Sequence, residues 1–192
     1  MIHEYVINGL PVKTGDIICT HDGGAPILEG QFWRFVGSLI PGEVDHVAVY
    51  VGPEGRCIEA GPKGVNFYEL ENNTWDAMKL RNQRGPVVDV FYGVALPVEG
   101  RDLTEKQKAE IRESVAEYCV QQAGKPYNLN FLDAETEDTF YCSQLVYLAY
   151  LKNGINLNTN LGVPHFPRMY NIIFPQEIWS GSVNKRAAQV SP

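Results

Sequence analysis

Four cysteines are the residues of this chain best suited to nucleophilic chemistry, and one of them lies in a context unlike the other three. Cys142 follows a polar loop and lies in the first turn of a stretch, 140–152, that is apolar nearly all round. Such a stretch predicts a buried helix, and the unpaired N–H groups and dipole at a helix N-terminus stabilise a thiolate. Because a cysteine is also often a small packing residue, Cys142 is a candidate nucleophile that needs independent support.

The other three cysteines fit packing positions. Cys119 lies on the apolar stripe of a predicted helix, and Cys19 and Cys57 lie in predicted strands. None of the four belongs to a Cys-x-x-Cys pair, so we expect no zinc site, no other metal and no cofactor. Without a sign of export, disulfides are not expected either.

A nucleophilic thiol needs a base, and His46 is the best placed of the four histidines. It begins a predicted strand, 46–51, in which alternation puts His46, Ala48 and Tyr50 on one face and three valines on the other. We expect the valine face to belong to the core. The histidine face can then look toward another layer or a cleft.

Glu59 is the candidate to orient this histidine. If Val51 pairs with Arg56 across the turn 52–55, Glu59 becomes a diagonal neighbour of His46, roughly 7 Å away on the same face. A carboxylate bound to one imidazole nitrogen fixes the tautomer and leaves the other nitrogen to act on the thiol. A register shift of one residue would move Glu59 to the opposite face.

These residues need a scaffold of mixed strands and helices. Residue patterns predict strands at 15–19, 46–51, 56–60, 64–70, 78–81 and 87–95, and helices at 32–40 and 140–152. A further helix is expected from the Asp102-Leu-Thr-Glu capping box to Gly124. No repeat or linker is visible, so we expect one α+β domain over residues 1–192, with its core at about 15–175 and a frayed tail from about Ser180.

Composition excludes several classes of function. Lys and Arg number 16 against 23 Asp and Glu, and this net charge of −7 disfavours a nucleic-acid partner on electrostatic grounds. No stretch approaches the roughly 20 apolar residues of a membrane span. The first residues do not form a signal peptide, so we expect a cytoplasmic protein, although a leader already removed would leave no trace.

The segment around Cys142 resembles a known family. The chain reads Gly124-Lys-Pro-Tyr127, a loop, and then Phe140-Tyr-Cys-Ser-Gln-Leu-Val. This resembles the NlpC-type papain-like cysteine peptidases, in which Gly-x-Pro-Tyr, a loop and Phe-Asp-Cys-Ser-Gly-Leu-Val carry the nucleophile. In that family a strand histidine follows the cysteine, whereas Asp45-His46-Val-Ala-Val-Tyr-Val-Gly precedes it here. This order is similar to the circularly permuted YaeF/YiiX-like branch, over about residues 15–175.

The resemblance implies an α+β, permuted papain-like (NlpC-type) fold, with an antiparallel sheet packed against helices that include the nucleophile helix. It also implies that Cys142 is the nucleophile, His46 the general base and Glu59 the orienting residue. Tyr127 matches the tyrosine thought to bind the oxyanion together with the backbone N–H of Cys142. A helix N-terminus is physically suited to that role, because its N–H groups point at the developing negative charge.

Three further residues are candidates for substrate contact: Tyr141, Ser143 and His165. His165 lies between two other loop residues, Pro164 and Phe166, and could line a pocket, although a loop histidine usually faces solvent. Tyr141 and Gln144 stand where the unpermuted family has Asp and Gly. For that reason its specificity for cell-wall peptides does not carry over directly.

The expected function is hydrolysis of amide bonds in short peptides or peptide-like substrates, cell-wall fragments among them, through an acyl-enzyme. A lipid substrate stays open as an alternative, by acyl transfer or by thioester or ester hydrolysis, because the related lecithin:retinol acyltransferase-like proteins use similar chemistry. Those proteins characteristically carry a second histidine and an Asn-Cys-Glu-His segment, and this chain has Glu59 and Tyr-Cys-Ser-Gln. A degenerate binding domain is the other alternative, and the complete set of catalytic residue types disfavours it.

Overall fold

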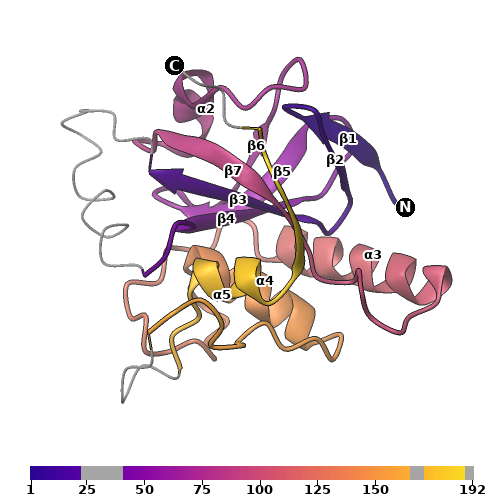
Figure 1. The fold of residues 1–192 in the computed structure, drawn as a ribbon. Coiled ribbons are helices and arrows are strands. Elements are labelled where there is room, and N and C mark those ends of the chain that lie inside the picture. Colours follow the sequence, from indigo (N-terminus) through magenta and orange to yellow (C-terminus); the bar gives the residue numbers. More distant parts are fainter. Residues whose placement is uncertain (23–40, 165–170, 189–192) are drawn as a thin grey trace.

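The computed structural model describes residues 1–22, 41–164 and 171–188, which form a sheet between two covering layers (Figure 1). The sheet has six strands in the order β6-β5-β4-β3-β7-β8, and each neighbouring pair is antiparallel. The strands are β3 (Ile17–Asp22), β4 (His46–Tyr50), β5 (Arg56–Gly61), β6 (Gly64–Glu69), β7 (Asp89–Leu96) and β8 (Val183–Arg186). The expected α+β class with a large antiparallel sheet is confirmed.

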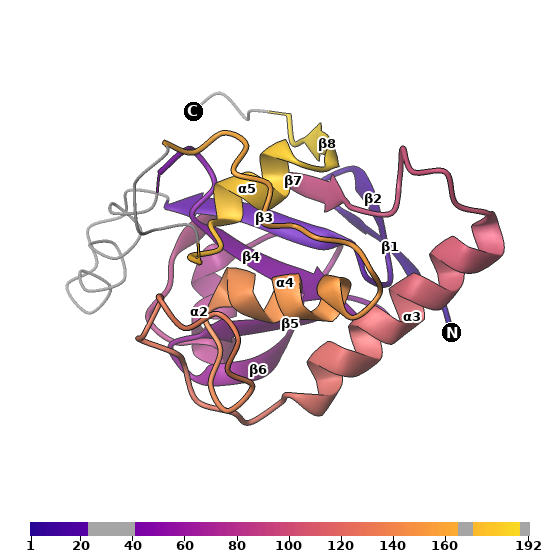
Figure 2. The ribbon, with the colours of Figure 1, turned by 90° about the horizontal axis from the view of Figure 1, so that it is seen from below.

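Helices cover one face of the sheet, as Figures 1 and 2 show. They are α3 (Glu105–Gln121), α4 (Cys142–Leu151) and α5 (Pro175–Ser180). The opposite face carries α2 (Ala77–Arg84) and a hairpin of β1 (Glu4–Ile7) and β2 (Leu10–Lys13). In the part of the chain that the structure describes, no helix is long and apolar enough to cross a membrane.

Each face of the sheet has its own apolar core, and β4 contributes to both. Val47 and Val49 are fully buried with the residues of the helical layer. Ala48 and Tyr50 are buried in the second core, with side chains of the hairpin and of α2. The valine face therefore belongs to the core as expected, and the face that begins with His46 lies against another layer.

The pairing of β4 with β5 has the register expected from the sequence. Val49 lies opposite Ile58, and the N–H of Val51 donates to the carbonyl of Arg56 at 3.0 Å. Continued along the strands, this register puts Glu59 on the face of His46. The local pattern of strand, short turn and strand was therefore enough to predict that His46 and Glu59 lie on the same face.

Residues 78–81, which we expected to form a strand, lie instead in α2. The side chain of Asp76 caps this helix by accepting a hydrogen bond from the N–H of Lys79, at 3.2 Å. Two residues four apart, Leu80 and Arg84, form its buried face. The helical period was hidden in the sequence because one of these buried residues is an arginine.

The two ends of the chain also differ from the expectation. The tail expected from Ser180 includes β8, which pairs with β7 although all four of its side chains are exposed. The helix α5 and the N-terminal hairpin were not expected at all. The capping box of α3 is formed by Thr104 and Gln107, two residues beyond the predicted start. The helix expected at 32–40 lies outside the described residues.

Gly64 lies against the backbone of the segment that precedes the nucleophile in the chain. Gly64 has a φ of +78°, and a Cβ there would lie 2.3 Å from the backbone oxygen of Lys125. Gly124 has a φ of +87° but has nothing within 4 Å of such a Cβ. A Cβ would therefore meet backbone strain at both positions but a steric clash only at Gly64.

We expect Gly64→Ala to destabilise the protein more than Gly124→Ala. Left-handed backbone costs about 1–2 kcal/mol for a residue with a Cβ at either position. Overpacking adds about 1–3 kcal/mol at Gly64 alone. Urea unfolding of the two variants and the wild type measures both losses. Equal losses would show that the close approach to Lys125 does not constrain this segment.

Candidate active site

Cys142 is the first residue of α4, the helix that crosses β4 and β5 on the helical side of the sheet (Figure 2). It is 4 % exposed. The first N–H groups of a helix have no partner inside the helix, and they favour negative charge beside them. The cysteine therefore stands where both a thiolate and an oxyanion are stabilised.

His46 is the first residue of β4, and its side chain bonds to Glu59 and lies close enough to Cys142 for their charges to interact. Nε2 lies 2.8 Å from Oε2 of Glu59. An ionised carboxylate only accepts hydrogen bonds, so Nε2 carries a hydrogen and Nδ1 is left for the thiol. This is the orientation that a base acting on a cysteine requires.

The charges beside His46 favour its protonated form. Burial alone would lower the pKa of His46, but the negative charges of Cys142 and Glu59 outweigh burial and raise this pKa well above its usual value. The imidazolium therefore persists at neutral pH and is lost only as the pH rises through the raised pKa. An imidazolium stabilises a thiolate beside it, and a thiolate is the form in which a cysteine acts as a nucleophile.

Glu59 is fully buried on the face of the sheet opposite α4, and it stays ionised. Burial alone would raise the pKa of Glu59, but the positive charges of Arg84 and His46 hold it below its usual range. Nε of Arg84 donates to Oε1 at 2.9 Å, and Nη2 donates to Oε2 at 2.8 Å. The carboxylate that orients His46 is thus itself held by two hydrogen bonds from the guanidinium of Arg84.

Tyr127 is held close to the nucleophile by a short parallel bridge to Phe140. The N–H of Phe140 donates to the carbonyl of Pro126 at 3.1 Å, and the N–H of Asn128 donates to the carbonyl of Phe140 at 3.0 Å. Burial and the negative charge of Cys142 raise the pKa of Tyr127 well above its usual value. Its phenol therefore keeps its proton and can donate a hydrogen bond.

The start of α4 is tied to the polar loop before it by Gln144, which is fully buried. Its side-chain oxygen accepts hydrogen bonds from the N–H of Tyr141, at 3.1 Å, and from Nδ2 of Asn128, at 3.0 Å. Its amide nitrogen donates to the carbonyl of Thr136 at 2.8 Å. The side chain of Gln144 thereby connects the first turn of α4 to the loop that precedes it.

The structure brings together four predicted site residues, Cys142, His46, Glu59 and Tyr127. Two others, Tyr141 and Ser143, bind the backbone of a neighbouring segment. The hydroxyl of Ser143 donates to the carbonyl of Ile173 at 2.6 Å, and the hydroxyl of Tyr141 accepts from the N–H of Ile173 at 3.1 Å. Both side chains are buried. These bonds favour a positioning role for Tyr141 and Ser143 over contact with substrate. His165 lies outside the described residues.

The three remaining cysteines differ from Cys142 in their surroundings. Cys19, Cys57 and Cys119 are free and fully buried, and burial raises the pKa of each thiol far above its usual value. They are therefore held as unreactive thiols. Among the described residues, no group of three or more His, Cys, Asp or Glu side chains could hold a metal ion.

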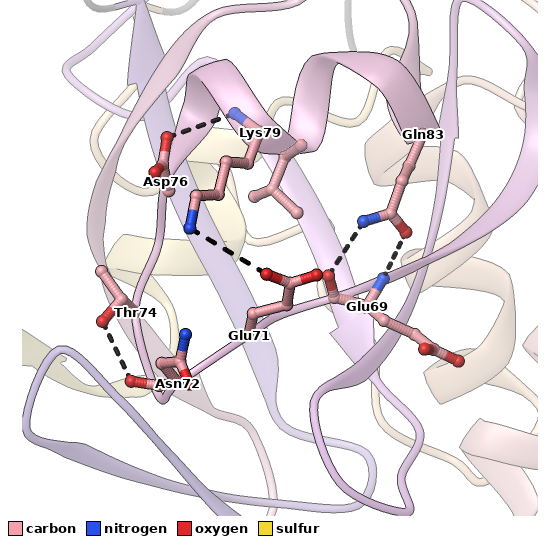
Figure 3. Close-up of a pocket in the computed structure, with 8 residues that line it drawn as sticks. Glu69, Glu71, Asn72, Thr74, Asp76, Lys79 and Gln83 are labelled. Atoms are coloured by element: carbon pink, nitrogen blue, oxygen red, sulfur yellow. Dashed lines mark hydrogen bonds and ion pairs between the residues drawn. The ribbon is translucent and has the colours of Figure 1, made fainter.

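A separate cavity of about 160 Å³ lies beside α2 and does not contain the predicted catalytic residues (Figure 3). Its lining comes from β6, the turn after it and α2, and includes Glu69, Lys79 and Gln83. The side chain of Gln83 exchanges two hydrogen bonds with the backbone of Glu69, and Lys79 pairs with Glu71 at 4.0 Å. The cavity gives no reason to place the reaction there.

Sequence reasoning missed the two residues that support Glu59. Arg84 binds Glu59 and also Asp89, at the start of β7, and the hydroxyl of Thr20 donates to Asp89 at 2.6 Å. No local motif connects these residues, because each comes from a different element. The one available signal was physical: a buried Glu59 carboxylate needs a nearby cation.

The comparison with known families agrees with this geometry. A family model described as "Permuted papain-like amidase enzyme, YaeF/YiiX, C92 family" matches residues 12–163. A search of curated proteins and a search of solved structures each found no match. The matched residues include the cysteine at the start of α4 and the histidine at the start of β4, in the permuted order. The chain therefore belongs to the permuted papain-like amidases of the YaeF/YiiX family.

Proposed function

We propose that this protein hydrolyses amide bonds of short peptides or peptide-like substrates through an acyl-enzyme on Cys142. The observation that carries the proposal is that the imidazole of His46 bonds to the Glu59 carboxylate at 2.8 Å while it lies beside Cys142, close enough for their charges to interact. This arrangement supplies a nucleophile, a proton carrier and an orienting group. The family, which consists of papain-like amidases, supports the same reaction type.

The proposed reaction has two halves. The Cys142 thiolate attacks the carbonyl carbon, and His46 gives its proton to the leaving amine as the C–N bond breaks. In the second half His46 takes a proton from water, and the resulting hydroxide attacks the thioester. The C–S bond then breaks, which releases the carboxylic acid and restores the ion pair of thiolate and imidazolium. Glu59 keeps the ring oriented in both halves.

Two hydrogen-bond donors are proposed to stabilise the tetrahedral intermediates. They are the phenol of Tyr127 and the backbone N–H of Cys142. The phenol is suitable because the surroundings raise the pKa of Tyr127 and so preserve its proton. A preorganised donor of this kind is typically worth about 10²–10³ in kcat.

A second candidate function is the hydrolysis or transfer of a lipid acyl group, and the loop before Cys142 favours it. Leu129 and Leu132 are 65 % and 60 % exposed. Phe131, between them, packs against the rings of Tyr127 and Tyr141, next to the nucleophile. Apolar side chains beside a reactive thiol would suit an acyl chain, so the substrate test must include lipids.

We expect mass spectrometry to detect an acyl-enzyme on Cys142. The intact protein is incubated with a panel of short peptides and, separately, with long-chain acyl thioesters and phospholipids, and is then quenched in acid. A peptidyl adduct absent from Cys142→Ala supports the proposed amidase. A long-chain acyl adduct alone supports the lipid function, and a wild type that neither forms adducts nor turns over any substrate contradicts both.

We expect iodoacetamide to alkylate Cys142 faster than the other cysteines at pH 6. The imidazolium of His46 persists at this pH and stabilises the thiolate, so His46→Ala should lower the rate at least tenfold. Peptide mapping after brief labelling identifies the modified thiol, and Cys142→Ser serves as the control. Labelling of Cys142 only above pH 8.5, with equal rates in His46→Ala, would refute the ion pair.

We expect Glu59→Gln to reduce turnover without unfolding the protein. The amide still occupies the site, but it removes the charge that stabilises the imidazolium and can present an N–H to His46. An incorrect tautomer lowers kcat by up to about 10⁴ in the best-studied triad, and a reduction of at least tenfold is expected here. Circular dichroism checks the fold, and wild-type kcat in this variant would remove Glu59 from the mechanism.

A further inference from the structure

Arg84 lies fully buried between two carboxylates and binds each of them with two nitrogens. Toward Glu59 it uses Nε and Nη2, at 2.9 and 2.8 Å. Toward Asp89 it uses Nη1 and Nη2, at 2.7 and 2.9 Å. Two-pronged bonds of this kind fix orientation as well as distance. Glu59, Arg84 and Asp89 therefore form one rigid unit.

The surrounding elements hold the guanidinium in place from several sides. Gln83, its neighbour in α2, exchanges hydrogen bonds with the backbone of Glu69 in β6 at 2.8 and 3.1 Å (Figure 3). The rings of Tyr68 and Trp75 lie 5.0 and 4.9 Å from the guanidinium carbon. Because the helix is attached to the sheet at this point, Arg84 reaches the buried carboxylates in a fixed geometry.

Asp89 is anchored independently of Arg84. Its carboxylate accepts a hydrogen bond from the hydroxyl of Thr20 at 2.6 Å, and its carbonyl accepts one from Nε1 of Trp75 at 3.0 Å. Burial alone would raise the pKa of Asp89, but the charges of Arg84 and His46 hold it below its usual range. Asp89 is therefore ionised, and it lies near His46 because Thr20, which binds it, is paired directly with His46 across β3 and β4.

The charges of this unit explain why two carboxylates are present. Glu59 and Arg84 alone would be neutral, and His46 would then face a carboxylate whose charge is cancelled behind it. Asp89 brings the net charge of the unit to −1. Among the residues that the structure describes, the charged and titratable groups around His46 are Glu59 of β5, Arg84 of α2, Asp89 of β7, Cys142 of α4, the adjoining Asp45, and Tyr127 beside Glu59 and Cys142.

We propose that Arg84 and Asp89 are positioning residues of this active site, with separate tasks. Arg84 fixes the carboxylate of Glu59 in the geometry that orients His46. Asp89 restores the negative charge that Arg84 cancels, and so extends the pH range over which His46 keeps its proton. This inference rests on the proposed function only in assuming that His46 serves Cys142. A purely structural salt bridge would affect stability but not the titration of His46.

The experiment follows the titration of His46 by NMR in the wild type, Asp89→Asn and Asp89→Glu. The His46 signal is assigned by its absence in His46→Asn. In Asp89→Asn the midpoint should fall by on the order of one pH unit, as expected when a nearby charge is removed. The alkaline limit of activity should move down with it. Asp89→Glu keeps the charge and should return the midpoint toward the wild-type value.

Asp16→Asn is the matched control. Asp16 is also a buried carboxylate bound to an arginine, Arg112 of α3, but it precedes β3 and lies beside Tyr50, at the opposite end of β4 from His46. We expect this variant to lose stability and to keep the His46 midpoint. An unchanged midpoint in Asp89→Asn, or an equal shift in Asp16→Asn, would overturn the role of Asp89.

A variant that keeps the charge separates position from charge. Arg84→Lys leaves a cation between the two carboxylates, so the unit stays at −1, but an ammonium cannot make the two-pronged bonds of a guanidinium. The His46 midpoint should stay near that of the wild type while kcat falls at least tenfold. Wild-type kcat would overturn the role of Arg84. The titrations need no substrate, so they can succeed even where no hydrolysis is found, which would count against the proposed function alone.

Discussion

An ionised carboxylate with no access to water is the constraint on which the rest of this site depends. Transfer of a carboxylate out of water costs several kcal/mol even after a protein relaxes around it, and an unpaired one would take up a proton. A protonated Glu59 could not hold His46 in its required tautomer. The arrangement around Glu59 therefore follows from the need to keep this group charged.

The group that keeps Glu59 charged lies on the opposite face of the sheet from the nucleophile. Cys142 comes from a helix on one face, whereas Glu59 and Arg84 lie on the other. His46 connects them because it is the first residue of β4, at the end of the sheet, where a side chain can reach both layers. None of these contacts depends on whether the histidine precedes or follows the cysteine in the chain. The permuted order therefore leaves the catalytic geometry intact.

The part of the site that could be predicted is the part determined by local patterns. The alternation in β4 and the short turn after it set the register, and an apolar stretch behind a polar loop located the start of α4. Arg84 could not be found in this way, because a buried arginine interrupts the apolar period that would have revealed α2. Similarly, β8 has no buried side chains and is ordered by backbone pairing with β7. Sequence patterns report burial, whereas these elements depend on charge pairing and on backbone hydrogen bonds.

The two departures from the Phe-Asp-Cys-Ser-Gly pattern also have a structural explanation. Tyr141 replaces the aspartate, and its hydroxyl accepts the N–H of Ile173, a residue far along the chain. Gln144 replaces the glycine, and it accepts the N–H of Tyr141 that begins the helix. Both side chains thus hold the backbone around Cys142 from within, where a charged aspartate would need a partner and a glycine would offer no bonds. The start of α4 is fixed by buried polar side chains, whereas the loop in front of it exposes the apolar side chains of Leu129 and Leu132.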